Sequence, residues 1–411
     1  MLAGKETYKK MRILLVHNYY QQPGGEDQVF SAESSMLKKH GCRAYRYTVH
    51  NDRIKGMNPL MLAGNTLWNK AIASELRETV RKVRPDVVHF HNTFPLISPA
   101  AYYVAKAEGI PVVQTLHNYR LLCPNAEFFY NNSVCEGCLG KAVPWPGALK
   151  GCYRDSRAQT AVVAMMLTFH RMLKTWQKKV DIYIALTDFA RNKFIEGGLP
   201  AEKIVVKPNF VYPDPGPKDS VGSYALFIGR LSPEKGIGTL LEAWKRLQGI
   251  PLKLVGDGPL MGEIRKSVEK EGLTCIETLG HCPQKDVLSL IKGARFLIFP
   301  SEWYETFGRV AIEAFACGVP VIASNLGAMA EIVEDGRTGL HFETGNSEDL
   351  AAKVEWAWTH EKEMLDMGRD AREEYEEKYT AERNYEMLME IYKKVTNTRK
   401  GGITGTDNEY T

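Results

Sequence analysis

Short apolar runs that alternate with amphipathic stretches organise the second half of the chain. We expect strands at 224–228, 252–255, 274–279, 296–299, 319–323 and 340–342, with helices between them. Wholly apolar runs of this length are typical of strands that are buried on both faces. Because these strands alternate with helices, the pattern predicts an α/β domain built on a parallel, doubly wound sheet.

The first half shows the same alternation with more irregular connections. We expect strands at 12–16, 42–49, 86–91, 112–116, 181–186 and 203–206, and helices at 26–40, 71–83 and 156–180. Residues 50–70 are expected to be irregular, and a cysteine-framed insertion occupies 118–155. We expect disorder at 1–10 and from 397 onward.

A stretch rich in Pro, Gly and Asp separates the two halves. It reads VYPDPGPKDS, residues 211–220, and is typical of a linker. The pattern therefore predicts two Rossmann-like domains, 1–215 and 216–375, followed by a charged helical segment, 376–411.

Composition places the chain among ordinary globular proteins. It has 411 residues, 44% hydrophobic and 25% charged, and its net charge of +4 is too slight to indicate nucleic-acid binding. No apolar run is long enough to span a bilayer and the N-terminus lacks a signal-peptide core, so we expect a cytoplasmic protein. The basic, Met-rich stretch 156–180 is of a kind that can lie on an anionic membrane, but a helix packed onto the core is the explanation we favour.

Two glutamates in the stretch 294–325 stand out. Seven residues separate Glu305 from Glu313, and on one helix they would lie about 80° and 12 Å apart. With Glu305 in the loop after a strand and Glu313 on the following helix, both can face the crevice where parallel sheets bind ligands. The helix begins near Phe307 and Gly308, where free N–H groups suit a phosphate. A ligand with both phosphate and hydroxyl groups fits this arrangement.

Other residues with ligand-binding chemistry also follow predicted strands. Arg230 and Lys235 come between strand 224–228 and a helix, as in a pyrophosphate clamp. Gly24 and Gly25 open a helix after the first strand, although they do not form a G-x-G-x-x-G fingerprint. His117 follows strand 112–116, so we favour a site role over a structural one.

Four cysteines frame the insertion at 118–155. They are Cys123, Cys135, Cys138 and Cys152, and they include one C-x-x-C pair. That spacing suits a structural Zn²⁺ site, and four reduced thiols are the alternative.

Taken in order, these motifs resemble the retaining glycosyltransferases of family 4, also described as glycosyl transferases group 1. The resemblance rests on the Gly24–Gly25 loop, His117, GRLSPEKG at 229–236, VGDGP at 255–259, and the E-x7-E unit with SEWYETFG and CGVPVIAS. It implies the GT-B fold, in which two Rossmann-like domains face a central cleft. It also implies transfer of a sugar from a nucleotide-sugar, with retention at the anomeric carbon.

The resemblance assigns roles to individual positions. Arg230 and Lys235 would hold the diphosphate, Glu313 the ribose, and Glu305 the donor sugar, which His117 would approach from the other domain. Backbone at Gly24, Gly25, Gly256, Phe307 and Gly308 would complete the donor site. The acceptor would be a saccharide or a lipid-linked saccharide, in cell-surface polysaccharide or glycolipid synthesis. The C-terminal helix would return to the first domain.

Metal-dependent donor binding is not expected, because the chain has no D-x-D motif. Because the predicted helix 156–180 is basic, we also expect peripheral contact with the cytoplasmic face of the membrane. Two alternatives stay open: another enzyme of the same fold, such as a nucleotide-sugar epimerase or a phosphorylase, and a non-catalytic subunit that binds sugar nucleotides.

Overall fold

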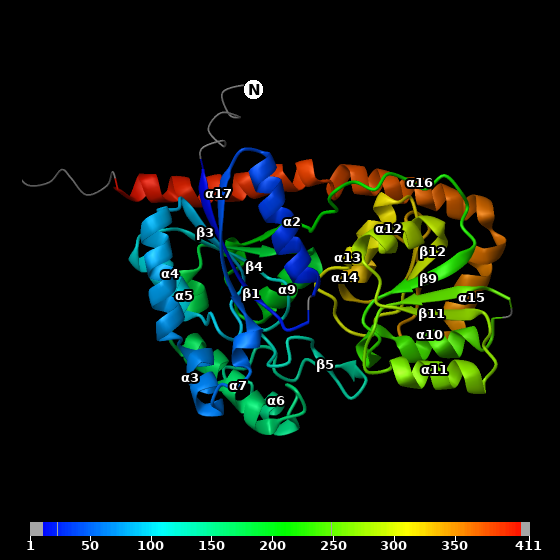
Figure 1. Ribbon diagram of the computed structural model, residues 1–411, viewed down its shortest axis with the longest axis horizontal. Coiled ribbons are helices and arrows are strands. Elements are labelled where there is room, and N and C mark those ends of the chain that lie inside the picture. The colour runs from blue at the N-terminus through cyan, green and yellow to red at the C-terminus, as the bar shows by residue number, and fades with distance from the viewer. Residues whose placement is uncertain (1–10, 23, 248, 404–411) are drawn as a thin grey trace, which may run out of the picture. The chain divides into compact units, whose positions relative to one another are not determined.

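The chain folds into two compact α/β units. The computed structural model describes residues 11–22, 24–247 and 249–403 (Figure 1). Unit 1 comprises Met1–Ala126, Glu136–Lys207 and Asn384–Thr411, and unit 2 comprises Glu127–Cys135 and Pro208–Arg383. The expectations of disorder at 1–10 and 404–411 fall outside the described residues.

Unit 1 is built on a parallel sheet of order β2-β1-β3-β4-β7-β8. Its strands are β1 (Arg12–Tyr19), β2 (Arg43–His50), β3 (Val87–Asn92), β4 (Val112–Thr115), β7 (Ile182–Ala185) and β8 (Ile204–Val206). Its principal helices are α2 (Gly25–Lys39), α3 (Pro59–Leu67), α4 (Lys70–Val83), α5 (Ala100–Ala107), α6 (Trp145–Lys150), α7 (Arg157–Met172), α8 (Thr175–Lys179) and α9 (Asp188–Glu196). The predicted parallel sheet of the first half is confirmed.

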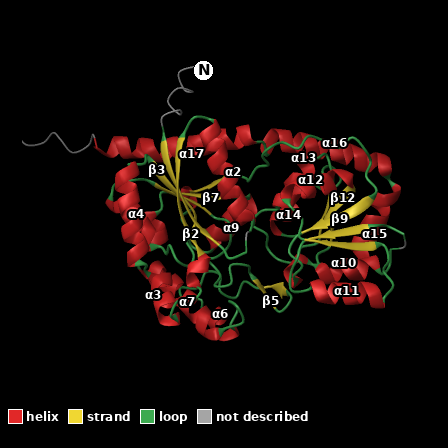
Figure 2. Cartoon of the chain, in the orientation of Figure 1, coloured by secondary structure: helices red, strands yellow, loops and turns green. Residues whose placement is uncertain are grey.

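Unit 2 repeats the arrangement with the parallel order β11-β10-β9-β12-β13-β14 (Figure 2). Its strands are β9 (Tyr224–Ile228), β10 (Leu252–Val255), β11 (Ile276–Gly280), β12 (Ala294–Phe299), β13 (Val321–Ser324) and β14 (Gly339–Phe342). Its helices are α10 (Ile237–Trp244), α11 (Met261–Lys270), α12 (Gln284–Gly293), α13 (Arg309–Ala316), α14 (Gly327–Ile332), α15 (Ser347–Thr359) and α16 (Glu361–Lys378). Because β10 and β12 flank β9, the sheet order reverses at β9, where sheets of this class bind ligands.

Three segments differ from their predictions. Residues 50–70 are not irregular: they contain a short 3-10 helix at Asn51–Ile54 and helix α3, which Asn58 caps through the N–H of Leu60 and which Pro59 begins. The predicted helix 156–180 is two helices, α7 and α8, because Lys174 adopts a left-handed conformation with φ of 52°. The insertion contains a two-stranded hairpin, β5 (Phe129–Tyr130) with β6 (Ser133–Val134), as well as α6.

The C-terminal helix α17 (Ala381–Ile403) begins in unit 2 and continues in unit 1. Within unit 1, Tyr392 donates or accepts a hydrogen bond with His89 at 2.7 Å, and the Lys207 ammonium donates to Asn384 at 2.9 Å. The helix extends to Ile403, so the expectation of disorder from 397 is wrong up to that residue. None of the described helices is both long and apolar enough to cross a bilayer.

Gly236 shows how tightly the loop after β9 packs onto the neighbouring strand β12. Its φ is +69°, and a Cβ there would lie 1.8 Å from the carbonyl oxygen of Pro300. Gly272 has a similar φ of +64° but open space around it. We predict that Gly272→Ala costs only the left-handed strain of about 1–2 kcal/mol, whereas Gly236→Ala adds about 1–3 kcal/mol for the clash.

Thermal and urea unfolding of the two variants measures this difference. Equal losses of stability in Gly236→Ala and Gly272→Ala would contradict the close approach of Gly236 to the carbonyl oxygen of Pro300.

Candidate functional site

An ion pair joins two of the predicted site residues in unit 2. The ammonium of Lys235 lies 2.6 Å from Oε1 of Glu305, and the two side chains are 21% and 8% exposed. The pair forms because β9 and β12 are parallel neighbours, with Leu226 opposite Leu297, so the loops that follow them meet at one edge of the sheet. A cation and a carboxylate therefore lie together at the switch point of this sheet.

Two further donors hold the same oxygen of Glu305. The hydroxyl of Ser301 and the indole N–H of Trp303 each donate to Oε1 at 2.8 Å. The Trp303 ring also lies 5.0 Å from the Lys235 ammonium, within the range of a cation–π contact. Ser301 and Trp303 had no predicted role, although both precede Glu305 in the same motif.

Glu313 occupies a more enclosed position on α13. It is 3% exposed, and its Oε1 accepts hydrogen bonds from Gln284 at 3.0 Å and lies 3.1 Å from the Arg309 guanidinium. Burial raises the pKa of Glu313, while Arg309 and the Gln284 hydrogen bond oppose that rise. Arg309 lies one helical turn before Glu313, which is a spacing that predicts contact; Gln284, in contrast, comes from α12 and has no signal in the sequence.

The remaining predicted donor-binding residues of unit 2 lie in the loops that follow β9, β10 and β12. Arg230 is exposed at the end of β9, and Phe307 and Gly308 are buried directly before α13. Gly256 has a φ of +136°, and a Cβ there would lie 1.9 Å from the carbonyl oxygen of Gly229. The turn after β10 therefore packs directly beneath the loop that carries Arg230, which explains the glycine.

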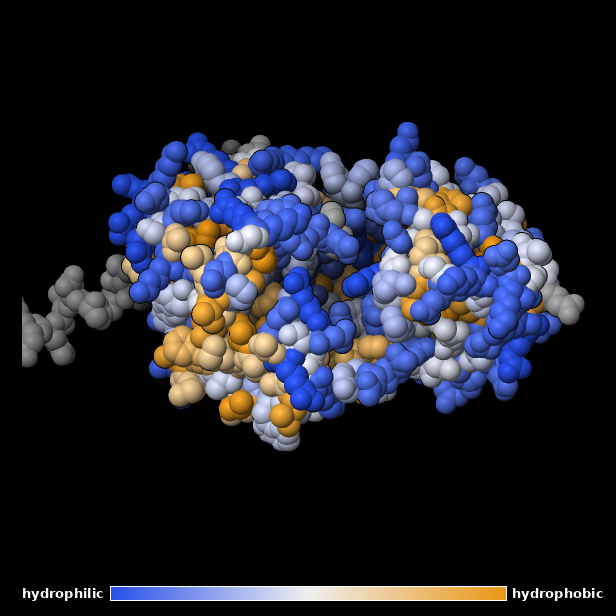
Figure 3. All heavy atoms as spheres, turned by 60° about the horizontal axis from the view of Figure 1, so that its bottom comes forward, coloured by the Kyte–Doolittle hydropathy of each residue, from blue (hydrophilic) through white to orange (hydrophobic). Residues whose placement is uncertain are grey.

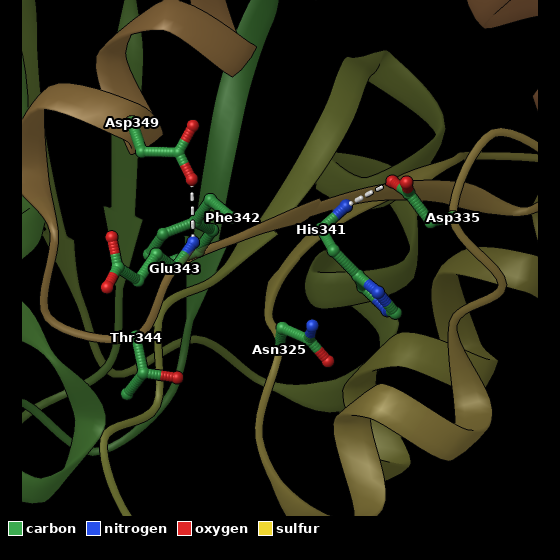
Figure 4. Close-up of a pocket in the computed structure, with 7 residues that line it drawn as sticks. All are labelled: Asn325, Asp335, His341, Phe342, Glu343, Thr344 and Asp349. Carbon is green, nitrogen blue, oxygen red and sulfur yellow. Dashed lines mark hydrogen bonds between the residues drawn. The ribbon is translucent and has the colours of Figure 1, made fainter.

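A hollow on another part of unit 2 does not match the predicted site. Figure 4 shows Asp335, Glu343 and Asp349 among its lining residues, together with Asn325, His341, Phe342 and Thr344. Asp335 and Asp349 each accept a backbone N–H, from His341 and Glu343, at 2.7 Å. These carboxylates stabilise the end of β14, and their charge is wrong for a diphosphate.

In unit 1, histidines gather where β1, β3 and β4 end side by side. His117 is partly exposed, and its Nε2 lies 3.0 Å from Nδ1 of His91, which is buried. Burial, followed by the nearby His91, holds the pKa of His117 well below its usual value, so the side chain is neutral at pH 7. His17 lies edge-on to His91, with ring centroids 6.3 Å apart, and its Nε2 contacts Asp27 at 2.6 Å.

The glycine pair lies at the start of α2. The N–H of Gly24 donates to Asp27 at 2.8 Å, and a Cβ at Gly24 or Gly25 would meet nothing within 4 Å. Packing within unit 1 therefore does not require glycine at either position. Glycine would instead allow a ligand to approach the backbone closely at these positions.

One group of described residues has the geometry of a metal site. Glu33, His89 and His91 are buried and place ligand atoms within 4.8 Å of one another. The Lys207 ammonium lies 3.5 Å from the other oxygen of Glu33 and already supplies positive charge there. That neighbour makes a second cation costly, so protons rather than a metal ion fit this cluster.

Family comparisons cover most of the chain. The description "Glycosyltransferase Family 4" matches residues 25–214, and "Glycosyl transferases group 1" matches residues 213–374. The chain belongs to the family 4, group 1 glycosyltransferases. The second match contains the Lys235–Glu305 pair, and the first contains His117.

Individual relatives agree with this assignment. An uncharacterised glycosyltransferase of Methanocaldococcus jannaschii is 34% identical over 42% of this chain and 49% of its own length. A lipopolysaccharide 1,2-N-acetylglucosaminetransferase of Salmonella typhimurium is 28% identical over 48% of this chain and 58% of its own length. The chain thus spans about half the length of these curated relatives.

A solved structure supports the predicted fold. The Anabaena protein HepE, in complex with UDP, superposes with a TM-score of 0.67 at 18% identity, over 93% of this chain and all of that one. At this level of identity the likeness shows the fold alone, and the GT-B prediction is confirmed.

The four-cysteine loop remains a predicted zinc site. Cys135 groups with unit 2, whereas Cys123, Cys138 and Cys152 group with unit 1. Cys138 accepts the N–H of Gly147 at 3.2 Å and donates to the carbonyl of Pro144 at 3.7 Å. We predict one zinc ion per purified chain, measured by elemental analysis, and its loss when Cys138 is replaced by Ser. Zinc absent from protein prepared without chelator would contradict the site.

Proposed function

We propose that the chain is a retaining glycosyltransferase that moves a sugar from a nucleotide-sugar to a saccharide or lipid-linked saccharide. The observation that carries this proposal is the Lys235–Glu305 pair at 2.6 Å, where parallel strands β9 and β12 end. Helix α13 begins directly after this loop, so its N-terminal N–H groups add a site for phosphate. Cations, hydrogen-bond donors and carboxylates at this edge of the sheet support the proposal that a nucleotide-sugar binds there.

The chemistry of the reaction assigns the roles. Breaking a bond between a sugar and a diphosphate builds negative charge on the leaving group and positive charge on the sugar. Lys235 and Arg230 would stabilise the leaving diphosphate, as fixed charges stabilise a transition state. Glu305 would contact the donor sugar, and its hydrogen bonds from Ser301 and Trp303 hold it in place when Lys235 turns to the diphosphate.

The nucleoside part of the donor fits the surroundings of Glu313. Its Oε1 is occupied by Gln284 and Arg309, and a carboxylate has further lone pairs that can accept ribose hydroxyls. Backbone at Gly24, Gly25, Gly256, Phe307 and Gly308 would complete the donor site, with His117 at the donor sugar. HepE was solved with UDP, which makes uridine nucleotides the first donors to try.

The acceptor side of the proposal rests on relatives. The Salmonella relative acts on lipopolysaccharide, and others are mannosyltransferases of O-antigen chains from Escherichia coli. We infer that this chain acts in the synthesis of a cell-surface polysaccharide or glycolipid. An acceptor of that kind is presented at a membrane surface when it is linked to lipid.

An exposed apolar patch on unit 1 supports contact with a membrane. It consists of Leu60 and Met61 on α3, Val143, Trp145 and Leu149 on or beside α6, and Met165, Phe169, Met172 and Leu173 on or beside α7. Helices α3 and α6 both pack against α7, so the patch is continuous, and Figure 3 shows hydrophobic side chains gathered on this face. Met172 is 78% exposed and Leu60 is 83% exposed. Exposed apolar side chains that gather on one face commonly mark an interaction surface.

Positive charge accompanies the apolar patch. Between residues 141 and 179 the only carboxylate is Asp155, whereas the cations are Lys141, Lys150, Arg154, Arg157, Arg171, Lys174, Lys178 and Lys179. Apolar side chains beside cations suit the surface of an anionic bilayer. One face of α7 packs onto the core, as expected, and Met166 and Leu167 are buried there, whereas Met165, Phe169 and Met172 on the same helix are exposed.

We predict that Lys235→Ala lowers turnover roughly 10²–10³-fold, the scale for losing one fixed electrostatic group in a transition state. Glu313→Ala should instead weaken nucleotide binding, since ribose contacts are similar in the ground and transition states. Steady-state kinetics with a donor found by screening nucleotide-sugars measures both effects.

Lys245→Ala is the matched control, because Lys245 also pairs with glutamates in unit 2 but lies away from the strand ends. Melting curves would show that each variant is folded. Normal turnover in a folded Lys235→Ala protein would contradict the proposal that Lys235 stabilises the leaving diphosphate. Donor binding without any sugar transfer would favour a non-catalytic subunit.

We also predict that the chain sediments with vesicles containing phosphatidylglycerol at low salt and less with vesicles of phosphatidylcholine alone. Replacing Leu60, Leu149 and Met172 by Ser should weaken binding by about tenfold or more, because their burial in the interface is lost. Tyr45→Ser, an exposed aromatic on β2, is the control. Equal binding by the triple variant would contradict a membrane-facing patch, and a shift from dimer to monomer would indicate a second copy instead.

A further inference from the structure

A buried chain of polar side chains stands behind His117 in unit 1. Its members are Glu33 on α2, His89 and His91 on β3, and Lys207 after β8, and their exposed fractions run from 0% to 2%. Buried charges on this scale are rare unless they are paired. The family motifs do not include Glu33, His89 or Lys207, so this network needs an explanation of its own.

Glu33 is the anion of the network. Its Oε1 lies 3.1 Å from Nδ1 of His89 and 3.1 Å from Nε2 of His91. Burial by itself raises the pKa of Glu33, but its neighbours His89, His91 and Lys207 outweigh burial and hold that pKa well below its usual value. The Nε2 of His91 faces a carboxylate oxygen and therefore carries a proton, since a lone pair there would be repelled.

The position of the proton on His91 determines the position of the proton on His117. Burial lowers the pKa of His91 to about 4, so its ring is neutral at pH 7 and carries one proton. With that proton on Nε2, facing Glu33, its Nδ1 holds a lone pair. This Nδ1 lies 3.0 Å from Nε2 of His117, which must therefore donate. A neutral His117 that donates through Nε2 has its own lone pair on Nδ1.

We propose that Glu33, through His91, fixes the Nε2–H tautomer of His117, so that His117 Nδ1 accepts a hydrogen bond from a hydroxyl of the bound sugar. Glu33 and His91 are thus positioning residues for His117, and the inference rests on the proposed function for the identity of its ligand. A neutral acceptor is suited to a sugar that gains positive charge in the transition state. A protonated imidazolium at the same place would repel that charge.

Side chains of α17 and β4 complete the hydrogen bonds of the network. Tyr392 contacts Nδ1 of His89 at 2.7 Å, Thr115 contacts its Nε2 at 2.8 Å, and Asn384 accepts from the Lys207 ammonium at 2.9 Å. These partners keep His89 and Lys207 in place around Glu33. The network therefore joins α2, β3, β4 and α17 within unit 1.

The test is ¹⁵N NMR of the whole chain with selectively labelled histidine, in which the His117 signals are assigned by comparison with His117→Gln. The expected result is that Nε2 of His117 is protonated and Nδ1 is not, with no substrate added. Glu33→Leu should allow His91 to donate through Nδ1, which moves the proton of His117 to its Nδ1. Turnover should then fall about tenfold, the scale of one lost hydrogen bond, while nucleotide affinity stays unchanged.

Glu33→Leu leaves the buried Lys207 ammonium without its anion, which would destabilise the fold. The double variant Glu33→Leu/Lys207→Met removes both charges, so the tautomer can still be measured in a folded protein. Asp27→Asn, which alters the partner of His17 instead, should leave the tautomer of His117 as it is. An Nδ1–H tautomer in the unaltered chain, an unchanged tautomer in the double variant, or a stoichiometric metal ion on His89 and His91 would each overturn the proposal. The tautomer is read without any donor, so failure of the glycosyltransferase proposal would be recognised separately by an absence of nucleotide binding.

Discussion

One carboxylate oxygen, Oε1 of Glu305, accepts hydrogen bonds from Lys235, Ser301 and Trp303, and the rest of the candidate donor site is arranged around it. The convergence follows from the sheet: β9 and β12 are parallel neighbours, so the loops at their carboxyl ends meet. Gly236 and Gly256 permit the close packing of those loops, because a Cβ at either position would overlap a carbonyl oxygen. A cation and an anion that are fixed before a ligand arrives need little reorganisation when charge develops on it.

Unit 1 solves a related problem with buried charge. A buried glutamate is costly, and here Lys207 and two histidines stabilise it. The hydrogen bond to Glu33 fixes which ring nitrogen of His91 carries the proton, and His91 in turn fixes the protonated nitrogen of His117. The buried contact between Glu33 and His91 thereby determines which nitrogen of the partly exposed His117 has a free lone pair.

The sequence predicted the strands well because strands buried on both faces are continuous apolar runs, and 224–228 and 252–255 coincide with β9 and β10. Glu305 and Lys235 were predicted as site residues from motifs that follow those strands, and the structure brings them together. Helix α3 was missed because Gly56, Pro59 and Gly64 are typical of irregular segments, whereas in the structure Pro59 begins the helix and Asn58 caps it. Gln284, Glu33 and Lys207 could not be predicted, since their contacts join segments far apart in the sequence. The break at Lys174 depends on one backbone angle, for which lysine carries no signal.

The central claim is that the Lys235 and Glu305 loops of unit 2 bind the diphosphate of a nucleotide-sugar. Thermal melting of the whole chain with nucleoside diphosphates, the matching monophosphates and the matching sugar nucleotides tests it most directly, because a ligand that binds only the folded state raises the melting temperature. The account predicts a rise with at least one diphosphate and its sugar, a smaller rise with the monophosphate, and the loss of that difference in Lys235→Ala. No rise with any diphosphate, or equal rises with monophosphate and diphosphate, would contradict it.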